Sequence, residues 1–251
     1  MNKLLQLLRA AVFYLGHVFV TVFLSVVFML VFVFLPDRGR HRFVSGWIGF
    51  VLFWLRLCCG VRHQVSGLEN LPDPLSGPPA VLLSNHQSAW ETLLLYRLVF
   101  PVAPLLKKEL LLIPFFGWAL RMEKPIAIDR SNPRSAGKAL LEQGVERIRQ
   151  GYSIIVFPEG TRSPVGQIKR FSRGGVRLAI AAQASVIPIA HNAGHCWPRN
   201  GFIKHPGLIS MVIGSPISTA EREPSELTEQ VENWIRAAID EMPTKVESST
   251  P

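Results

Sequence analysis

The chain has 251 residues, of which 48% are hydrophobic and 18% charged, and its formal net charge is +9. A basic and apolar chain suits a membrane surface or a nucleic acid as partner. Nucleic acid is disfavoured because no zinc-finger spacing and no RNA-binding aromatic motif is present. Cys58, Cys59 and Cys196 form neither a disulfide framework nor a metal-ligand spacing, so we expect reduced thiols, a reducing compartment and no metal.

The N-terminal segment is predicted to be a membrane anchor. No formal charge lies between Arg9 and Asp37, and residues 18–35 are almost wholly apolar, which is close to the ~20 residues that cross a hydrocarbon core. A signal peptide is disfavoured because the apolar run is long and a poor cleavage site follows it. A basic loop at 37–42 precedes a second, less apolar segment at 43–59. A hairpin in one leaflet, or one span followed by an interfacial helix, fits this pattern, and charges on both flanks leave the orientation open.

Short apolar runs alternate with helical segments in the rest of the chain. Strands are predicted at 61–65, 80–84, 125–128, 153–157, 185–189 and 209–213, and helices shortly after residue 88, at 135–150, at 176–184 and at 225–242. Continuous apolar strands between helices predict an α/β fold, with a mixed, largely parallel sheet covered by helices on both faces.

The predicted organisation has three parts. Residues 1–60 form the N-terminal two-helix membrane anchor, residues 61–220 form the α/β domain, and residues 221–251 form a C-terminal amphipathic helix with a polar tail. The apolar stripe of the last helix is expected to pack against the domain. The tail beyond residue 243 is expected to be disordered.

His86 and Glu91 lie at a predicted junction between a strand and a helix. An imidazole paired with a carboxylate can take a proton from a hydroxyl at neutral pH. Five residues at about 100° each would place the two side chains on different helix faces, so they meet only if His86 precedes the helix and Glu91 lies in its first turn. Glu91 also completes a capping box with Ser88, and the catalytic and capping roles are compatible.

A second candidate site is the segment 157–163, Phe-Pro-Glu-Gly-Thr-Arg-Ser, at the end of a predicted strand. Ligands of open α/β sheets bind at the carboxyl ends of strands. Arg162 can bind a phosphate through two parallel hydrogen bonds, and Gly160 lets backbone amides approach it. Arg130 also follows a predicted strand. Two arginines at strand ends favour an anionic ligand over a merely solvated basic surface.

Taken in order, these segments resemble the 1-acylglycerol-3-phosphate acyltransferases of the glycerolipid acyltransferase superfamily. Four blocks carry the resemblance: 85–91 with the His-x4-acid motif, 126–130, 157–163 and 186–190. The similarity extends over residues 67–216. The acidic residue of the first block is usually Asp in this family, whereas here it is Glu91, which keeps the charge and adds one methylene.

The resemblance implies an enzyme that moves a fatty acyl group from acyl-CoA or acyl-carrier protein to the free hydroxyl of lysophosphatidic acid, giving phosphatidic acid in phospholipid biosynthesis. His86 would be the general base and Glu91 would orient it, with no covalent acyl-enzyme, cofactor or metal. The substrate-binding residues that it implies are Lys107, Arg130, Glu159, Gly160, Thr161 and Arg162. Arg130 and Arg162 would bind the acceptor phosphate, and Lys107 this phosphate or the developing oxyanion.

Several alternatives stay open at this point. Ser88 or Cys196 could act as a covalent nucleophile, although no Gly-x-Ser-x-Gly elbow is present; His191 and His195 are interpreted as structural. The acceptor could instead be glycerol 3-phosphate, another lysophospholipid or a lyso-aminolipid, or the chain could be a non-catalytic lipid-binding or scaffold protein. We expect a location in the inner, cytoplasmic membrane with the catalytic domain on the cytoplasmic side. No pattern in the sequence indicates the preferred acyl-chain length, the choice of donor or the oligomeric state.

Overall fold

The computed structural model describes residues 3–129 and 131–243. Arg130, which was predicted to bind the acceptor phosphate, and the tail beyond residue 243, which was predicted to be disordered, lie outside these ranges. The helices are α1 (Lys3–Val31), α2 (Asp37–Cys59), α3 (Trp90–Leu98), α4 (Phe116–Met122), α5 (Pro133–Arg149), α6 (Gly174–Ala181) and α7 (Pro224–Asp240). The strands are β1 (Val61–Ser66), β2 (Val81–Ser84), β3 (Val102–Ala103), β4 (Leu105–Lys107), β5 (Ile126–Ile128), β6 (Ser153–Val156), β7 (Val186–His191) and β8 (Gly207–Ile213).

The main sheet has six strands in the order β1-β8-β7-β2-β6-β3. Four of its strand pairs are parallel, and β7 and β8 pair antiparallel, so the prediction of a mixed, largely parallel sheet is confirmed. Strand β5 lies outside this sheet and pairs parallel with β4. Neither β3 (two residues) nor β4 (three residues) was predicted.

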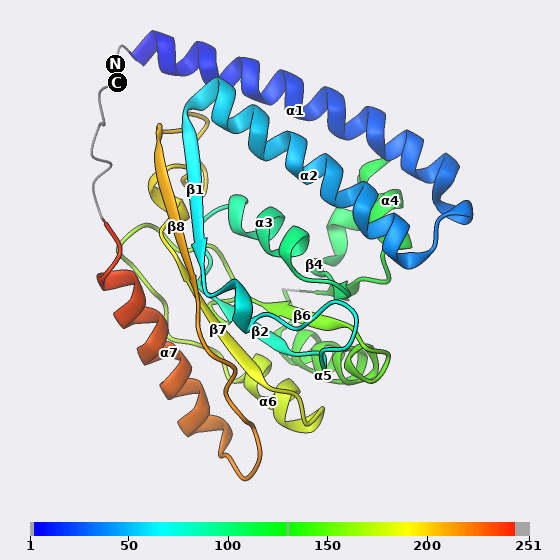
Figure 1. Ribbon diagram of the computed structural model, residues 1–251, viewed down its shortest axis with the longest axis vertical. Coiled ribbons are helices and arrows are strands. Elements are labelled where there is room, and N and C mark those ends of the chain that lie inside the picture. Colours follow the sequence, from blue (N-terminus) through cyan, green and yellow to red (C-terminus); the bar gives the residue numbers. More distant parts are fainter. Residues whose placement is uncertain (1–2, 130, 244–251) are drawn as a thin grey trace.

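Helices cover both faces of the sheet, as Figure 1 shows with α2 and α3 on one side and α5, α6 and α7 on the other. The side chains of β2 alternate between two cores because successive residues of a strand point to opposite faces. Leu82 packs with Trp90 and Leu95 of α3, whereas Val81 and Leu83 pack in the core that includes α5, α6 and α7. The β2–α3 loop therefore starts from a strand that is buried on both sides.

Helices α1 and α2 form an antiparallel hairpin that lies along the α3 side of the domain (Figure 1). Trp47 of α2 donates a hydrogen bond of 3.1 Å to Thr21 of α1, and the Trp54 indole lies where a Cβ at Gly16 would be. The 37–42 segment was predicted to be a loop, and that prediction is wrong. It forms the first turns of α2, because Pro36 stands at the N-cap and Asp37 places a negative charge in the first turn.

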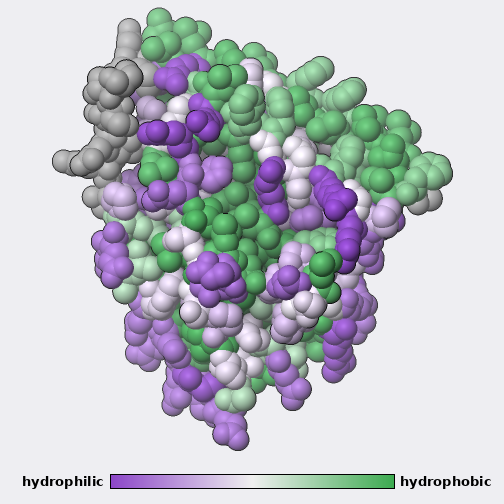
Figure 2. Space-filling model, viewed as in Figure 1, coloured by the Kyte–Doolittle hydropathy of each residue, from purple (hydrophilic) through white to green (hydrophobic). Residues whose placement is uncertain are grey.

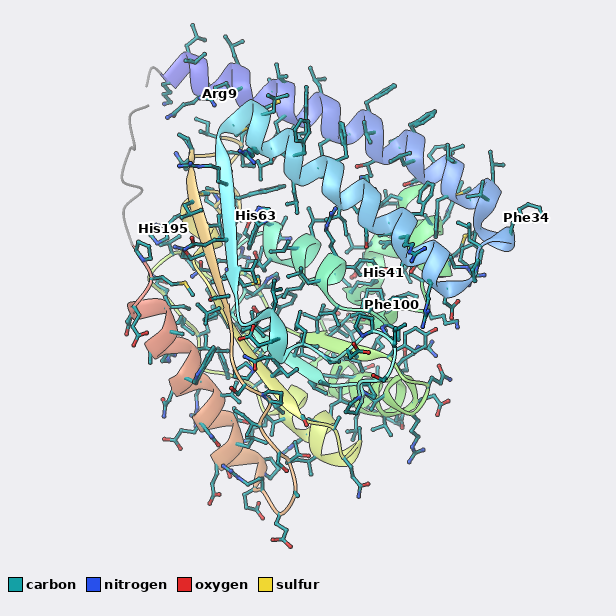
Figure 3. The ribbon with its side chains drawn as sticks, in the orientation of Figure 1. Arg9, Phe34, His41, His63, Phe100 and His195 are labelled. Atoms are coloured by element: carbon teal, nitrogen blue, oxygen red, sulfur yellow. The ribbon has the colours of Figure 1, made fainter. Side chains whose placement is uncertain are left out.

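Both N-terminal helices are long and apolar enough to cross a membrane. Helix α1 starts well before the predicted apolar run, and much of its length is not covered by protein. Its exposed apolar side chains include Leu4, Leu8, Leu15, Phe19, Phe23 and Leu30. Hydrophobic surface gathers over α1 and the hairpin tip, where Phe34 points outward, while hydrophilic surface gathers at the end that carries α7 (Figure 2 and Figure 3).

Candidate active site

The His86–Glu91 pair forms as the spacing requires, with His86 in the β2–α3 loop and Glu91 in the first turn of α3. The His86 Nδ1 atom lies 2.9 Å from Glu91 Oε1, and both side chains are buried. A carboxylate oxygen accepts, so Nδ1 carries the proton of this contact and a neutral ring leaves Nε2 free as a base. The same Oε1 accepts the Ser88 amide at 2.8 Å, so the capping contact and the imidazole contact coexist.

The environment of Glu91 favours its ionised form. Burial raises the pKa of this carboxyl, but His191, His86 and the Ser88 amide outweigh the burial and lower the pKa below its usual range. The Gln87 amide adds another hydrogen bond to Oε1, at 3.0 Å. The remaining oxygen, Oε2, is buried and accepts no hydrogen bond from the described residues. Glu91 therefore presents a buried negative charge to the imidazole of His86.

The 157–163 segment holds the His86 loop from the other side. The Phe157 ring stacks on the His86 ring with centroids 4.1 Å apart. Glu159 Oε1 accepts the His86 amide at 2.7 Å, and the Ser163 amide donates to the His86 carbonyl at 2.7 Å. The Ser163 hydroxyl donates to Glu159 Oε2. Glu159 thus fixes the backbone of His86, and the prediction that it binds substrate stays a prediction.

A cavity of about 470 Å³ opens beside His86. Most of its wall is apolar and comes from the anchor helices and the domain together; it includes Leu24, Phe28, Phe43, Trp47, Leu93, Leu106, Phe116 and Leu120. Its polar lining includes His86, Lys107, Thr161, Arg162 and Arg199, from loops at or beyond the carboxyl ends of β2, β4, β6 and β7. An apolar chain and an anionic group can therefore occupy adjoining parts of one cavity.

Comparison with known proteins agrees with this arrangement. The sequence profile of a family described as Acyltransferase matches residues 62–192. The chain belongs to the acyltransferase family. It is 47% identical to the 1-acyl-sn-glycerol-3-phosphate acyltransferase of Pseudomonas aeruginosa, over 83% of this chain and 81% of that protein. The protein of the same name from Cocos nucifera is 26% identical over 96% of this chain and 76% of that protein.

A solved structure resembles this acyltransferase over nearly its whole length. The crystal structure of the 1-acyl-sn-glycerophosphate (LPA) acyltransferase PlsC from Thermotoga maritima superposes with a TM-score of 0.81 at 25% identity. The match covers 99% of this chain and 100% of that one. The resemblance inferred from the four sequence blocks is thereby confirmed.

The acyltransferase places the predicted substrate-binding residues unequally around the cavity. Thr161, Arg162 and Lys107 line it, and Lys107 lies 3.5 Å from Glu109. Gly160 has a φ of 71°, a conformation that glycine adopts without strain, and open space surrounds it. Glu159 lies behind the His86 loop. None of these residues has a tested role, so their assignment stays a prediction.

The residues considered as alternatives are tied into the structure elsewhere. His191 is fully buried; its Nε2 donates to the Asn85 carbonyl at 2.8 Å, its Nδ1 accepts the Ala193 amide at 3.2 Å, and burial lowers its pKa. His195 is exposed at the edge of the molecule (Figure 3). Cys196 is buried, which raises its pKa to about 11, and Ser88 Oγ accepts the Trp90 amide at 3.1 Å. Among the described residues, no three His, Cys, Asp or Glu side chains converge to hold a metal ion.

Two residues at the site were given no role by the sequence-based prediction. Phe157 was included in the 157–163 segment but given no role, because its stacking on His86 depends on how β2 and β6 lie side by side. Arg199 was not noted at all. It lies eight residues beyond the end of β7, and nothing in its local sequence indicates that the chain returns to Arg162 there.

Proposed function

We propose that this acyltransferase moves a fatty acyl group from a thioester donor, acyl-CoA or acyl-carrier protein, to the free hydroxyl of lysophosphatidic acid, giving phosphatidic acid. The observation that carries the proposal is that the buried His86–Glu91 pair borders a largely apolar cavity that Lys107 and Arg162 also line. The names of the curated relatives support the same acceptor.

In the proposed reaction, His86 Nε2 removes the proton of the acceptor hydroxyl while that oxygen attacks the thioester carbonyl. Glu91 holds Nδ1–H and stabilises the imidazolium that forms, as the acid of a catalytic triad does. The C–S bond then breaks, and the imidazolium returns its proton to the departing sulfur. A thiol has a pKa of about 8.5, so it leaves without strong acid catalysis. No residue of the chain becomes acylated.

The rest of the site would position the two substrates. Arg162 would bind the acceptor phosphate, together with Arg130, while Lys107 would serve that phosphate or the oxyanion. The apolar wall formed by the anchor helices, α3 and α4 suits a fatty acyl chain. Direct attack, rather than a covalent intermediate, agrees with the environments of Ser88 and Cys196, neither of which lines the cavity.

We also propose that the anchor lies in one leaflet of the inner membrane, with the catalytic domain on the cytoplasmic side. Contacts along the hairpin keep it against the domain: Arg97 of α3 donates to the Ser45 carbonyl at 2.8 Å, and Lys204 donates to the Tyr14 hydroxyl at 2.8 Å. Because both helices of the hairpin contact the domain, a position along the membrane surface suits them better than a span across the membrane. Thioester donors are cytoplasmic metabolites, which supports the orientation.

The experiment that tests the proposal is a panel of acceptors assayed with both donors. Purified protein in detergent would receive lysophosphatidic acid, glycerol 3-phosphate, a lysophosphatidylcholine or a lyso-aminolipid, with acyl-CoA or acyl-carrier protein. Thiol release and lipid product would be measured together. We expect turnover to be highest with lysophosphatidic acid. Higher turnover with another acceptor would show that lysophosphatidic acid is not the preferred acceptor. Absence of turnover with every acceptor would favour a lipid-binding or scaffold protein.

A further inference from the structure

Arg199 is a cation at the cavity with no assigned role. It lies in the segment between β7 and β8, and its Nη1 donates to the backbone carbonyl of Arg162 at 2.7 Å. Its side chain lines the same cavity as His86 and Arg162. The bond to the carbonyl uses one of the five guanidinium N–H groups. The other four are available to a ligand.

The charge around Arg199 is unbalanced. Within the described ranges it forms no ion pair with a carboxylate, and the cavity lining also contains Arg162 and Lys107, of which Lys107 is paired with Glu109 at 3.5 Å. The only described carboxylate in that lining is Glu123, which accepts a hydrogen bond from the Tyr96 hydroxyl at 2.6 Å. The guanidinium groups of Arg162 and Arg199 therefore lie beside the proposed base without a carboxylate partner among the described residues. A phosphate monoester, with a charge of about −1.5 to −2, would balance two guanidinium groups.

The segment that carries Arg199 is fixed on both sides of it. Upstream, the Gly194 amide donates to the Gln87 side chain at 3.2 Å, which ties the segment to the His86 loop. The buried Trp197 ring meets the Phe13 ring of α1 with centroids 5.4 Å apart. Downstream, Lys204 donates to the Gly201 carbonyl at 2.6 Å. These contacts fix the backbone of the segment, while the 2.7 Å bond to the Arg162 carbonyl holds the exposed Arg199 guanidinium, so less conformational entropy is lost when it binds a ligand.

We propose that Arg199 is a further acceptor-binding residue, whose guanidinium binds the phosphate of the lysophosphatidic acid beside Arg162. This inference rests on the function proposed above. The bond from Arg199 to the Arg162 carbonyl brings the two residues to the same point of the cavity wall. When the free hydroxyl of the acceptor is on the central glycerol carbon, the phosphate is attached through its oxygen to the neighbouring glycerol carbon. The phosphate must therefore lie close to His86, where both arginines line the cavity.

The test compares wild-type enzyme with the variants Arg199→Ala and Arg199→Lys. Lysophosphatidic acid is varied at saturating acyl-CoA, and acyl-CoA is varied at saturating acceptor. Loss of a hydrogen bond to a charged group corresponds to about 10- to 100-fold. We expect Arg199→Ala to raise the KM for lysophosphatidic acid by about that factor, with kcat changed by less than about 3-fold and the KM for acyl-CoA unchanged. Arg199→Lys should recover part of the loss. Arg222→Ala is the matched control, because Arg222 bonds Gln230 of α7, outside the cavity lining.

A 2-deoxy analogue of lysophosphatidic acid, which keeps the phosphate and cannot be acylated, gives a second readout. Its inhibition constant should rise in Arg199→Ala by the same factor as the KM. A fall in kcat alone, with unchanged KM and inhibition constant, would show a purely structural role and overturn the inference. A rise confined to the KM for acyl-CoA would assign Arg199 to the donor phosphates and also overturn it. Failure of wild-type enzyme to acylate lysophosphatidic acid would refute the proposed function itself, which is a distinct result.

Discussion

A single carboxylate oxygen organises the β2–α3 loop. Glu91 Oε1 accepts hydrogen bonds from His86 Nδ1 and from the backbone amides of Gln87 and Ser88, with distances of 2.8 to 3.0 Å. The bond from the Ser88 amide to Glu91 was predicted from the sequence because its spacing is local, but the capping box is incomplete, since Ser88 Oγ accepts the Trp90 amide and Ala89 is the N-cap. The stacking of Phe157 and the support from Glu159 were not predicted, because both depend on the neighbouring strand β6. The extra methylene of glutamate, compared with the aspartate usual in this family, is accommodated without loss of the imidazole contact.

The role of the negative charge can be separated from the role of the cap. In Glu91→Gln the side-chain oxygen can still accept amide hydrogen bonds, but it no longer stabilises an imidazolium. We expect kcat to fall by about 100- to 10,000-fold, with little change in the far-UV circular dichroism. Glu91→Asp, which keeps the charge, should retain far more activity than Glu91→Gln. Equal activities for the Glu91→Gln variant and the wild-type enzyme would reduce Glu91 to a helix cap.

At the scale of elements, the segment between β7 and β8 connects the N-terminal helices to the candidate active site. Trp197 packs on Phe13, Lys204 bonds Tyr14, and Arg199 bonds Arg162. Strands β2, β6, β7 and β8 and helices α5, α6 and α7 were predictable because each has a clear apolar pattern. The role of this connecting segment was not, since it depends on contacts between residues as distant in sequence as Tyr14 and Lys204.

Lys204 makes the stability of this junction dependent on pH. Burial lowers the pKa of its ammonium to about 8, whereas an unfolded lysine has a pKa of about 10.4. Between these values the unfolded chain binds more protons, so stability should rise with pH through this window and the cost of the buried charge should be complete below it. In Lys204→Met this contribution should vanish.

The measurement is the Tm of wild-type and variant protein in detergent, from pH 7.5 to pH 10. Wild-type protein should gain Tm relative to Lys204→Met as the pH rises. Lys169→Met changes an exposed lysine and serves as the control, with no such relative gain. Parallel curves for wild-type protein and Lys204→Met would show that Lys204 titrates as it does in the unfolded chain.

At the scale of the whole molecule, the anchor has two surfaces with different tasks. Leu24 and Phe28 of α1, with Trp47 of α2, line the cavity beside His86. The opposite side of α1 exposes Leu15 and Phe19, 73% and 70% exposed. Hydrophobic surface is concentrated at this end of the protein (Figure 2). The anchor is therefore a wall of the cavity as well as the surface available to a membrane.

Polar substitution on the outer surface should separate these tasks. In the double variant Leu15→Asn, Phe19→Asn, we expect binding to anionic liposomes to weaken by about 10-fold or more. The reason is that each substitution removes the favourable free energy of burying an apolar side chain in the membrane. Turnover in detergent should change little, since neither residue lines the cavity. Co-sedimentation with liposomes and thiol release measure the two properties. Leu75→Asn, on an exposed loop of the domain, is the control. Undiminished liposome binding by the double variant would contradict a membrane contact through this side of α1.

Formation of phosphatidic acid by His86→Ala tests general-base catalysis by this residue most directly. His86 touches Glu91, Phe157 and the cavity, so its removal deletes the proposed base and leaves the proposed phosphate-binding residues in place. Purified wild-type and variant enzymes would receive acyl-CoA and lysophosphatidic acid, and lipid product and free thiol would be measured. We predict that kcat falls by about 100- to 10,000-fold, while the 2-deoxy analogue still binds. Turnover by His86→Ala at the wild-type rate would contradict general-base catalysis by this residue.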